Sequence, residues 1–253
     1  MNTETVRSQL KTLKLHTAAS ELQEVLAEHK KAVALSWISD LLEREIDFRR
    51  ERGLMTRIKK ANFPEITTLE TFDWSFNPQI DENRIRQMAT LDFISNNQIC
   101  LFLGQPGTGK THLALAIGVL AANRGYRVYC NCLKRLAEDI LRAKAKNNLD
   151  ALFKKILSAR LWIFDDWGVT TMSREVAEEV FDLLDRRKHS SAMIMTSNRD
   201  VDEWPQVFPD PVIANATIDR IFDRADISVF KGTSYRLKGK IVIKNVDVKI
   251  RKN

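Results

Sequence analysis

The feature that most constrains this chain is the octapeptide GQPGTGKT at residues 104–111. It fits the pattern GxxxxGK[ST], follows the apolar run ICLFL and opens a helical stretch, THLALAIGVLAA, which is the context that the pattern requires. Glycines let the backbone curl so that successive amides point inward at phosphates, and the start of the following helix adds partial positive charge. The run therefore predicts a phosphate-binding loop between a strand and a helix, and a chance glycine-rich turn is the alternative.

Two side chains of this loop carry specific chemistry. Lys110 is expected to reach the β- and γ-phosphates of ATP, and the hydroxyl of Thr111 is expected to ligate Mg²⁺. ATP and Mg²⁺ are therefore the predicted cofactors. The residues predicted to contact the nucleotide are Gly104, Pro106, Gly107, Thr108, Gly109, Lys110, Thr111 and His112.

Two further apolar runs end in polar side chains. Residues 161–164 are followed by Asp165 and Asp166, at the end where a parallel strand delivers side chains to a ligand. We predict that Asp165 holds Mg²⁺ and that Asp166 orients or deprotonates the attacking water, for which a carboxylate must lie within about 3 Å of that water. The run 192–196 leads to Asn198, whose amide is expected to sense the γ-phosphate. A surface acid and a turn-forming asparagine are the alternatives for Asp166 and Asn198.

The order of predicted elements indicates an α/β fold. Strand-like runs at 99–103, 126–130, 161–164 and 192–196 alternate with helical stretches. This alternation is typical of a parallel sheet flanked by helices.

The chain divides into three predicted parts. Residues 1–62 read as a small all-helical N-terminal domain, because apolar residues recur there at three- and four-residue intervals. Residues 63–80 contain two prolines and four aromatic residues and read as a linker laid over the next domain. Residues 81–253 form the nucleotide-binding domain and end in a basic tail. The helical domain is expected to serve DNA binding, partner binding or self-association.

The charge distribution favours a polyanionic partner. The net charge is +7, and residues 231–253 alone hold eight Lys and Arg against one Asp. Exposed cations in one stripe attract nucleic acid, although each basic group could equally be a solvated helix face. Outside the tail, the candidate DNA contacts are Arg49, Arg50, Arg52, Arg57, Lys59, Lys60, Lys134, Arg135, Arg142, Lys144 and Lys146.

The sequence gives no sign of export or membrane insertion. The first residues lack the apolar run of a secretory signal, and no 18-residue apolar stretch follows. The three cysteines form neither a CxxC pair nor a metal-spaced set. We therefore expect a soluble, cytoplasmic protein with no membrane partner.

The motifs together resemble one family. In order along the chain they are GQPGTGKTH, LWIFDDWG, MTSN, DPVIANATIDRIFDR and KGTSYRLK, preceded by basic helices and the segment FPEITTLETFDW. This arrangement is similar to the IstB-type helper ATPases of insertion-sequence transposition, over essentially the whole length.

The resemblance implies an AAA+ P-loop NTPase fold of the initiator clade, a homo-oligomer with ATP between neighbouring subunits, and an arginine supplied by the neighbour. That arginine corresponds best to Arg220, with Arg224 in reserve, and an ordinary surface ion pair is the alternative. Arg236 is a weaker candidate for contact with nucleotide or DNA. The implied partners are double-stranded DNA and the transposase of the same element.

One residue departs from the common AAA+ pattern. Asp166 stands where many of these proteins have glutamate, and the shorter side chain places water farther from the base unless the backbone compensates. This departure keeps open a function as a nucleotide-gated scaffold with little turnover.

Two other functions also stay open. One is an ATP-dependent switch on duplex DNA, and the other is a helicase loader of the DnaC type that prefers single strands.

Overall fold

The structure, a computed structural model, describes residues 3–28, 36–187 and 190–238. The chain forms two compact units, Met1–Arg57 and Ile58–Asn253. The division falls inside one helix, α3 (Ser36–Ala61), shortly before the predicted end of the helical domain at residue 62.

The first unit is helical, with α1 (Thr3–Thr12) and α2 (His16–Glu28) beside the first part of α3. The turn between α1 and α2 includes Lys14, whose φ of 61° is left-handed. Ser39 of α3 donates its hydroxyl hydrogen bond to the Gln9 amide oxygen of α1 at 3.0 Å, so polar and apolar contacts both join these helices. The apolar cluster consists of Val6, Leu10 and Ala19, with Leu22, Ile38 and Leu42 packed against it.

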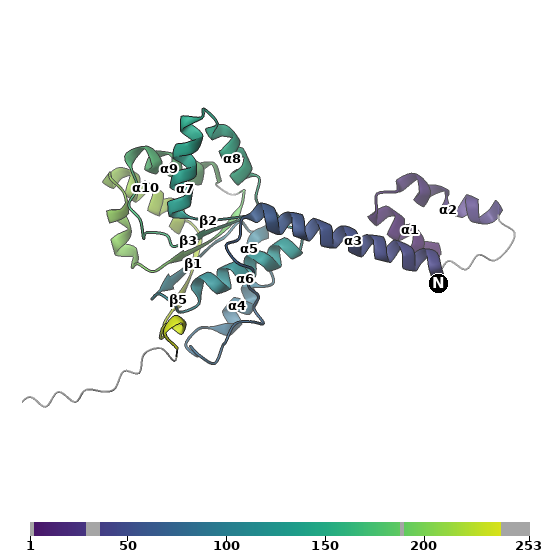
Figure 1. Ribbon diagram of the computed structural model, residues 1–253, viewed down its shortest axis with the longest axis horizontal. Helices are drawn as coiled ribbons and strands as arrows, with labels where there is room; N and C mark the ends of the chain where they lie inside the picture. Colours follow the sequence, from purple (N-terminus) through teal and green to yellow (C-terminus); the bar gives the residue numbers. More distant parts are fainter. Residues whose placement is uncertain (1–2, 29–35, 188–189, 239–253) are drawn as a thin grey trace, which may run out of the picture. The chain divides into compact units, whose positions relative to one another are not determined.

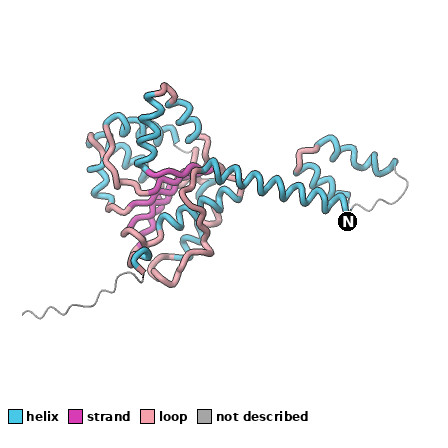
Figure 2. The backbone as a smooth tube through the Cα atoms, viewed as in Figure 1, coloured by secondary structure: helices cyan, strands magenta, loops and turns pink. Residues whose placement is uncertain are grey.

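The second unit is built on a five-stranded sheet in the order β2-β3-β4-β1-β5, with every neighbouring pair parallel. Figure 2 shows the strands in magenta at the centre of this unit. Their bounds are β1 (Ile99–Gly104), β2 (Val128–Cys132), β3 (Leu161–Asp165), β4 (Ala192–Ser197) and β5 (Ala225–Phe230).

Four of these strands lie at or near the runs that the sequence predicts, and β5 lies outside them. Strand β2 also begins two residues later than the predicted run 126–130. β5 is an edge strand with the sequence ADISVF, in which Ile227 and Val229 are exposed while Ser228 and Phe230 are buried. Its polar residues interrupt the apolar run that marks a central strand, so the pattern is weak at this edge.

Helices cover both faces of the sheet (Figure 1). α5 and α6 contact β4 on one face, and α7 contacts β2, α8 and α9 on the other. The helices are α4 (Glu82–Met88), α5 (Asp92–Ser95), α6 (Lys110–Asn123), α7 (Leu133–Ala145), α8 (Leu149–Leu157), α9 (Arg174–Arg187) and α10 (Pro211–Phe222), with 3-10 turns η1 (Val201–Val207) and η2 (Tyr235–Leu237). Among the described residues no helix is long and apolar enough to cross a membrane.

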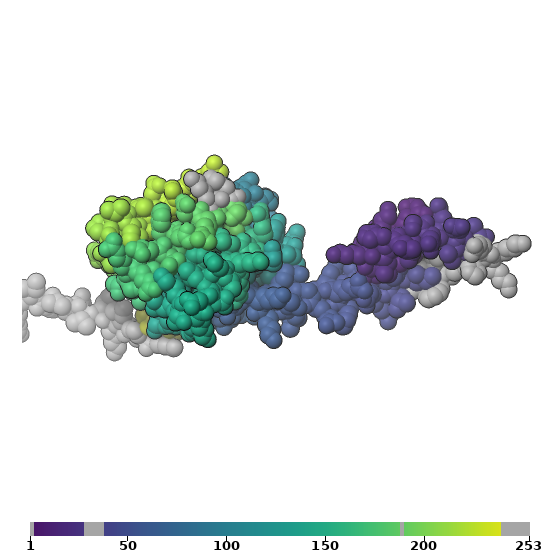
Figure 3. All heavy atoms as spheres, turned by 90° about the horizontal axis from the view of Figure 1, so that it is seen from above, coloured from purple at the N-terminus to yellow at the C-terminus, as the bar shows by residue number. Residues whose placement is uncertain are grey.

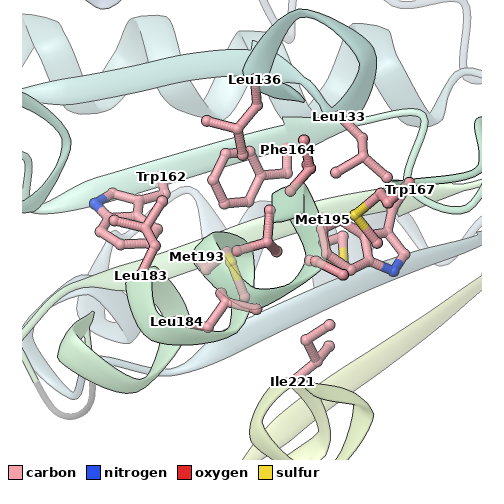
Figure 4. Packing of buried hydrophobic residues seen from close by; sticks show 14 of the residues in the cluster. Leu133, Leu136, Trp162, Phe164, Trp167, Leu183, Leu184, Met193, Met195 and Ile221 are labelled. Atoms are coloured by element: carbon pink, nitrogen blue, oxygen red, sulfur yellow. The ribbon is translucent and has the colours of Figure 1, made fainter. Parts of the chain in front are cut away.

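The core fixes the strand ends that carry the predicted site. Trp162 and Phe164 of β3 and Met193 and Met195 of β4 belong to one cluster with residues of α9. Ile163, between the first two, lies on the other face against α6. Gly118 of α6 allows close approach to β3, because a Cβ there would overlap the end of Ile163. Figure 4 shows part of the cluster on the α9 side, which includes Trp162, Phe164, Trp167, Leu183, Leu184, Met193, Met195 and Ile221.

Candidate nucleotide-binding site

The loop between β1 and α6 has the backbone that its glycines predict. Gly109 caps α6 with a left-handed φ of 104°, and a Cβ there would lie 2.5 Å from the Phe72 ring. Gly104 has a φ of 144°, and a Cβ there would overlap the carbonyl oxygen of Phe230 in β5. Neither position tolerates a side chain without displacing its neighbours, so glycine is required by both conformation and space.

Lys110 lies inside the loop. The residue is 4% exposed. Its Nζ donates to the carbonyl oxygens of Gly104 and Gln105, both at 2.7 Å. Burial lowers the pKa of Lys110 to about 8, against the opposing effects of Asp166 and Asp165. The amine is therefore close to a change of charge near neutral pH, and a phosphate beside it would favour the charged form.

Asp165 and Thr111, the predicted Mg²⁺ ligands, lie together. Thr111 Oγ1 donates to Asp165 Oδ1 at 2.8 Å, which joins the start of α6 to the end of β3. The same carboxylate oxygen accepts a hydrogen bond from Thr196 Oγ1 at 2.6 Å. A hydroxyl and a carboxylate are hard oxygen ligands, and Mg²⁺ is commonly held by one or two carboxylates together with substrate phosphates. The pair fits a magnesium site.

Asp166 follows in a strained conformation. Its φ is 55°, and its backbone N–H donates to Thr196 Oγ1 at 3.0 Å. Asn198 Nδ2 donates to Asp166 Oδ1 at 3.0 Å, so the predicted base and the predicted sensor are in direct contact. Burial raises the pKa of Asp166, and Asp165 raises it further, while Lys110, Arg236 and Asn198 oppose the change. A raised pKa suits a carboxylate that takes up a proton.

A cavity of about 310 Å³ opens over the loop. Of the predicted residues, Pro106, Gly107, Thr108, Gly109, Lys110, Thr111, His112, Asp166 and Asn198 line it. The sequence reasoning did not assign a further set to the site, namely Glu65, Thr71, Phe72, Asp73, Phe76, Asn77 and Tyr235.

Three of these residues, Phe72, Phe76 and Tyr235, form an aromatic wall of the cavity. Phe76 and Tyr235 have ring centroids 4.9 Å apart in an edge-to-face arrangement. The backbone N–H of Tyr235 donates to Gly107 O at 2.9 Å, which holds the C-terminal segment over the loop. Asn77 bonds the backbone of Thr233 through both its amide nitrogen and its amide oxygen, each at 3.1 Å. The four aromatics counted in segment 63–80 were the available signal, and they were interpreted only as a covering linker.

His112 connects this segment to α6. Its Nε2 lies 3.1 Å from Thr68 O and 3.3 Å from Thr71 Oγ1, and its ring centroid is 5.4 Å from that of Phe72. Thr67 Oγ1 donates to the backbone oxygen of His112 at 3.0 Å. The imidazole therefore holds the wall beside the loop as well as lining the cavity.

The predicted arginines divide into two groups. Arg236 lines the cavity. Arg220 does not, and its Nε donates to Asp185 of α9 at 3.0 Å. Arg224 lies in the turn before β5 with a left-handed φ of 61°. Arg220 is therefore placed for contact outside the cavity of its own chain.

Several of the predicted DNA-contacting residues are engaged in ion pairs. Arg49 contacts Glu45 at 2.6 Å, and Lys144 contacts Glu179 at 2.8 Å. Lys134, Arg135 and Lys146 are exposed on or directly after α7. Figure 3 shows the teal surface of α7 and α8 beside the green surface of the segment that follows. Residues 239–253 of the basic tail lie outside the described residues.

The parallel sheet, the glycine-rich loop and the paired acids define an AAA+ P-loop protein. Its fold is similar to the DnaC helicase loader, with a TM-score of 0.54 and 20% identity over 65% of this chain and 97% of that chain. It is likewise similar to AMPPCP-bound DnaA from Aquifex aeolicus, with a TM-score of 0.54 and 21% identity over 75% of this chain and 58% of that chain.

The chain belongs to the family of IstB-like ATP binding proteins, whose family model matches residues 8–242. One relative, from Pseudomonas aeruginosa, is named for insertion sequence IS21 and for ATP binding. It is 38% identical over 91% of this chain and 88% of its own length. Another, from Geobacillus stearothermophilus, is named for insertion sequence IS5376 and is 35% identical over 87% of this chain and 89% of its own length. The predicted family resemblance is confirmed.

Proposed function

We propose that this protein is a Mg²⁺-dependent ATPase that assembles on duplex DNA with ATP and recruits or activates the transposase of its insertion sequence. ATP hydrolysis then drives its release. The observation that carries this proposal is the cluster of Thr111, Asp165, Asp166 and Asn198 beside the phosphate loop, at a cavity of about 310 Å³.

The residues present fit ATP and its metal. Lys110 and the loop amides would bind the phosphates, and Phe76 and Tyr235, whose rings meet edge-to-face, offer aromatic contacts to a purine base. Thr111 and Asp165 would hold Mg²⁺, which neutralises charge on the phosphates. Lys110 would exchange its two carbonyl partners for phosphate oxygens.

Asp166 is the proposed base for the attacking water, with Asn198 holding its carboxylate. The left-handed turn at Asp166 changes the direction in which its short side chain leaves the backbone. This supports the idea that the backbone compensates for a side chain one methylene shorter than glutamate. Direct contact with Asn198 supports a shared role at the γ-phosphate.

Arg220 is the proposed arginine that acts on a neighbouring subunit. Its guanidinium contacts Asp185 and lies outside its own cavity, as expected for a group whose target belongs to another chain. A planar cation that reaches the phosphates only on assembly makes hydrolysis depend on oligomerisation.

Duplex DNA is the proposed polyanion, and two observations support it. Exposed side chains that can bind phosphate lie at both ends of α7: Lys134 and Arg135 at its start and Lys146 directly after its end. The relatives named for insertion sequences tie the family to mobile DNA. Phosphate contacts give affinity with little sequence preference and a steep dependence on salt.

The test measures ATP hydrolysis and DNA binding in the same samples. We expect Lys110→Ala to lose nucleotide binding, Asp166→Asn to bind ATP and DNA without turnover, and Arg220→Ala to bind ATP without turnover. Arg174→Ala is the matched control, because the Nε of Arg174 likewise donates to an acid, Glu178, at 3.1 Å.

The outcomes separate the open functions. Preference for single-stranded DNA would favour a helicase loader of the DnaC type. DNA binding that needs ATP, combined with wild-type turnover no faster than that of Asp166→Asn, would favour a nucleotide-gated scaffold. Binding to duplex DNA that ignores nucleotide would overturn the proposal.

A further inference from the structure

Thr196 lies between the two acids of the site, and one hydroxyl contacts both. The residue is fully buried at 0% exposure near the end of β4. Its Oγ1 donates to Asp165 Oδ1 at 2.6 Å and accepts from the backbone N–H of Asp166 at 3.0 Å. A hydroxyl has one proton to donate and two lone pairs, so this arrangement uses its only donor on the carboxylate of Asp165.

The backbone of β4 holds the same segment in place. The carbonyl oxygen of Thr196 accepts from the N–H of Trp167 at 2.8 Å, and Ser197 Oγ donates to Trp167 O at 2.8 Å. The Trp167 side chain is fully buried and lies 6.2 Å from Trp204, ring centroid to ring centroid. A left-handed conformation at a residue other than glycine is costly and persists where its surroundings fix it. Three hydrogen bonds and a buried ring fix it at Asp166.

The contact has a direct consequence for Asp165. Its Oδ1 accepts from both Thr111 at 2.8 Å and Thr196 at 2.6 Å, one hydroxyl on α6 and one on β4. Two donors on a single oxygen restrain rotation of the carboxylate, because a turn away from either donor weakens that hydrogen bond. Hydrogen bonds of this kind orient metal ligands, and their loss typically lowers metal affinity by about 10- to 100-fold.

We propose that Thr196 is a positioning residue that aims the Asp165 carboxylate at Mg²⁺ and holds the turn that presents Asp166 to the attacking water. This inference rests on the proposed ATPase function and adds to it a buried residue that does not line the cavity. In the run MTSN the sequence predicts a site role for Asn198 and none for Thr196, since a threonine inside an apolar strand is typical of the core.

The test compares three variants of the full chain. Thr196→Val keeps the shape and removes the hydroxyl, whereas Thr196→Ser keeps the hydroxyl and removes the methyl group. Ser191→Ala is the matched control, because Ser191 is 1% exposed just before the other end of β4 and its Oγ donates to Ala159 O at 2.6 Å. Each sample is measured for ATP affinity in EDTA, ATP affinity across Mg²⁺ concentration, phosphate release and melting temperature.

We expect Thr196→Val to bind ATP in EDTA within about twofold of wild type, and to need at least about 10-fold more Mg²⁺ for half of the metal-dependent gain in affinity. Phosphate release should fall by about 10-fold or more. Thr196→Ser should show the wild-type Mg²⁺ requirement. Ser191→Ala should lower the melting temperature and leave the Mg²⁺ requirement at its wild-type value. If Thr196→Val does not fold, Thr196→Cys, a weaker donor of similar volume, should give an intermediate Mg²⁺ requirement.

A wild-type Mg²⁺ requirement in folded Thr196→Val, or in Thr196→Cys if only that variant folds, would overturn the inference and leave the proposed function intact. An equal change in Ser191→Ala would also overturn it, since the effect would then follow stability alone. A wild-type protein that binds no ATP would overturn the proposed function and the inference together.

Discussion

The pKa of Lys110 makes ATP binding depend on pH in a defined direction. In the protein alone, burial lowers this pKa from an ordinary 10.5 to about 8. Phosphate oxygens beside the amine favour its charged form and should return the pKa to at least the ordinary value. At pH 7 and below the amine is already almost fully charged and binding takes up little or no proton at Lys110. Above pH 8 the free protein has a neutral amine, so binding takes up a proton and becomes weaker as pH rises.

The size of the effect follows from these two pKa values. At pH 9 an amine with a pKa of about 8 is about nine-tenths neutral, so ATP binding should take up about 0.9 proton at Lys110. Between about pH 8 and pH 10 the affinity should fall by about 40-fold in all, most steeply near pH 9. The full shift back to 10.5 corresponds to about 3 kcal/mol of favourable interaction between amine and phosphates.

Isothermal titration calorimetry with a non-hydrolysable ATP analogue measures this uptake. The titration is repeated at pH 7 and pH 9 in buffers of different ionisation enthalpy, which reports the protons taken up. Lys110→Arg, whose guanidinium stays charged at both pH values and can still contact phosphates, is the control for every other group. Equal uptake in wild type and Lys110→Arg at pH 9, or none in wild type, would refute the reasoning.

Three further predictions concern the loop, the wall and the DNA surface. Gly104→Ala should lower the free energy of unfolding by about 3 kcal/mol or more in chemical denaturation, whereas Gly125→Ala, a left-handed glycine with nothing within 4 Å, should cost about 1 kcal/mol. Phe76→Ala should weaken ATP binding in calorimetry by about 1–3 kcal/mol and should change the binding of inorganic triphosphate little. Lys146→Ala should weaken duplex DNA binding and reduce the slope of log affinity against log salt concentration by about 1. Lys144→Ala should have a smaller effect, because Lys144 is already paired with Glu179. Equal effects of Gly104→Ala and Gly125→Ala, or of Lys146→Ala and Lys144→Ala, would contradict these assignments.

The parts of the site that could be predicted from the sequence are those with local signals. The loop 104–111 needs glycines, a lysine and a flanking strand and helix within a short stretch, so the pattern is nearly sufficient. Asp165 and Asn198 follow apolar strands, and parallel strands bring such ends to the same edge of a sheet. The contact between Thr111 and Asp165 at 2.8 Å follows from that geometry.

The remainder of the site depends on contacts distant in the sequence. Phe76 and Tyr235 meet at the cavity although 159 positions separate them, and no local pattern connects an aromatic linker to a C-terminal turn. The sequence does not predict β5, because this strand lies at the edge of the sheet, where alternate residues are exposed. Its polar residues interrupt the apolar run that marks a buried strand. The left-handed turn at Asp166 arises from hydrogen bonds to β4, which its own sequence does not show.

Binding of a labelled DNA duplex tests the central claim most directly. The protein is titrated onto the duplex with a non-hydrolysable ATP analogue and Mg²⁺, with ADP, and without nucleotide, at two salt concentrations. The account predicts cooperative binding only with the ATP analogue, lost steeply as salt rises because several phosphates are contacted. Binding of equal strength in all three nucleotide conditions would contradict it.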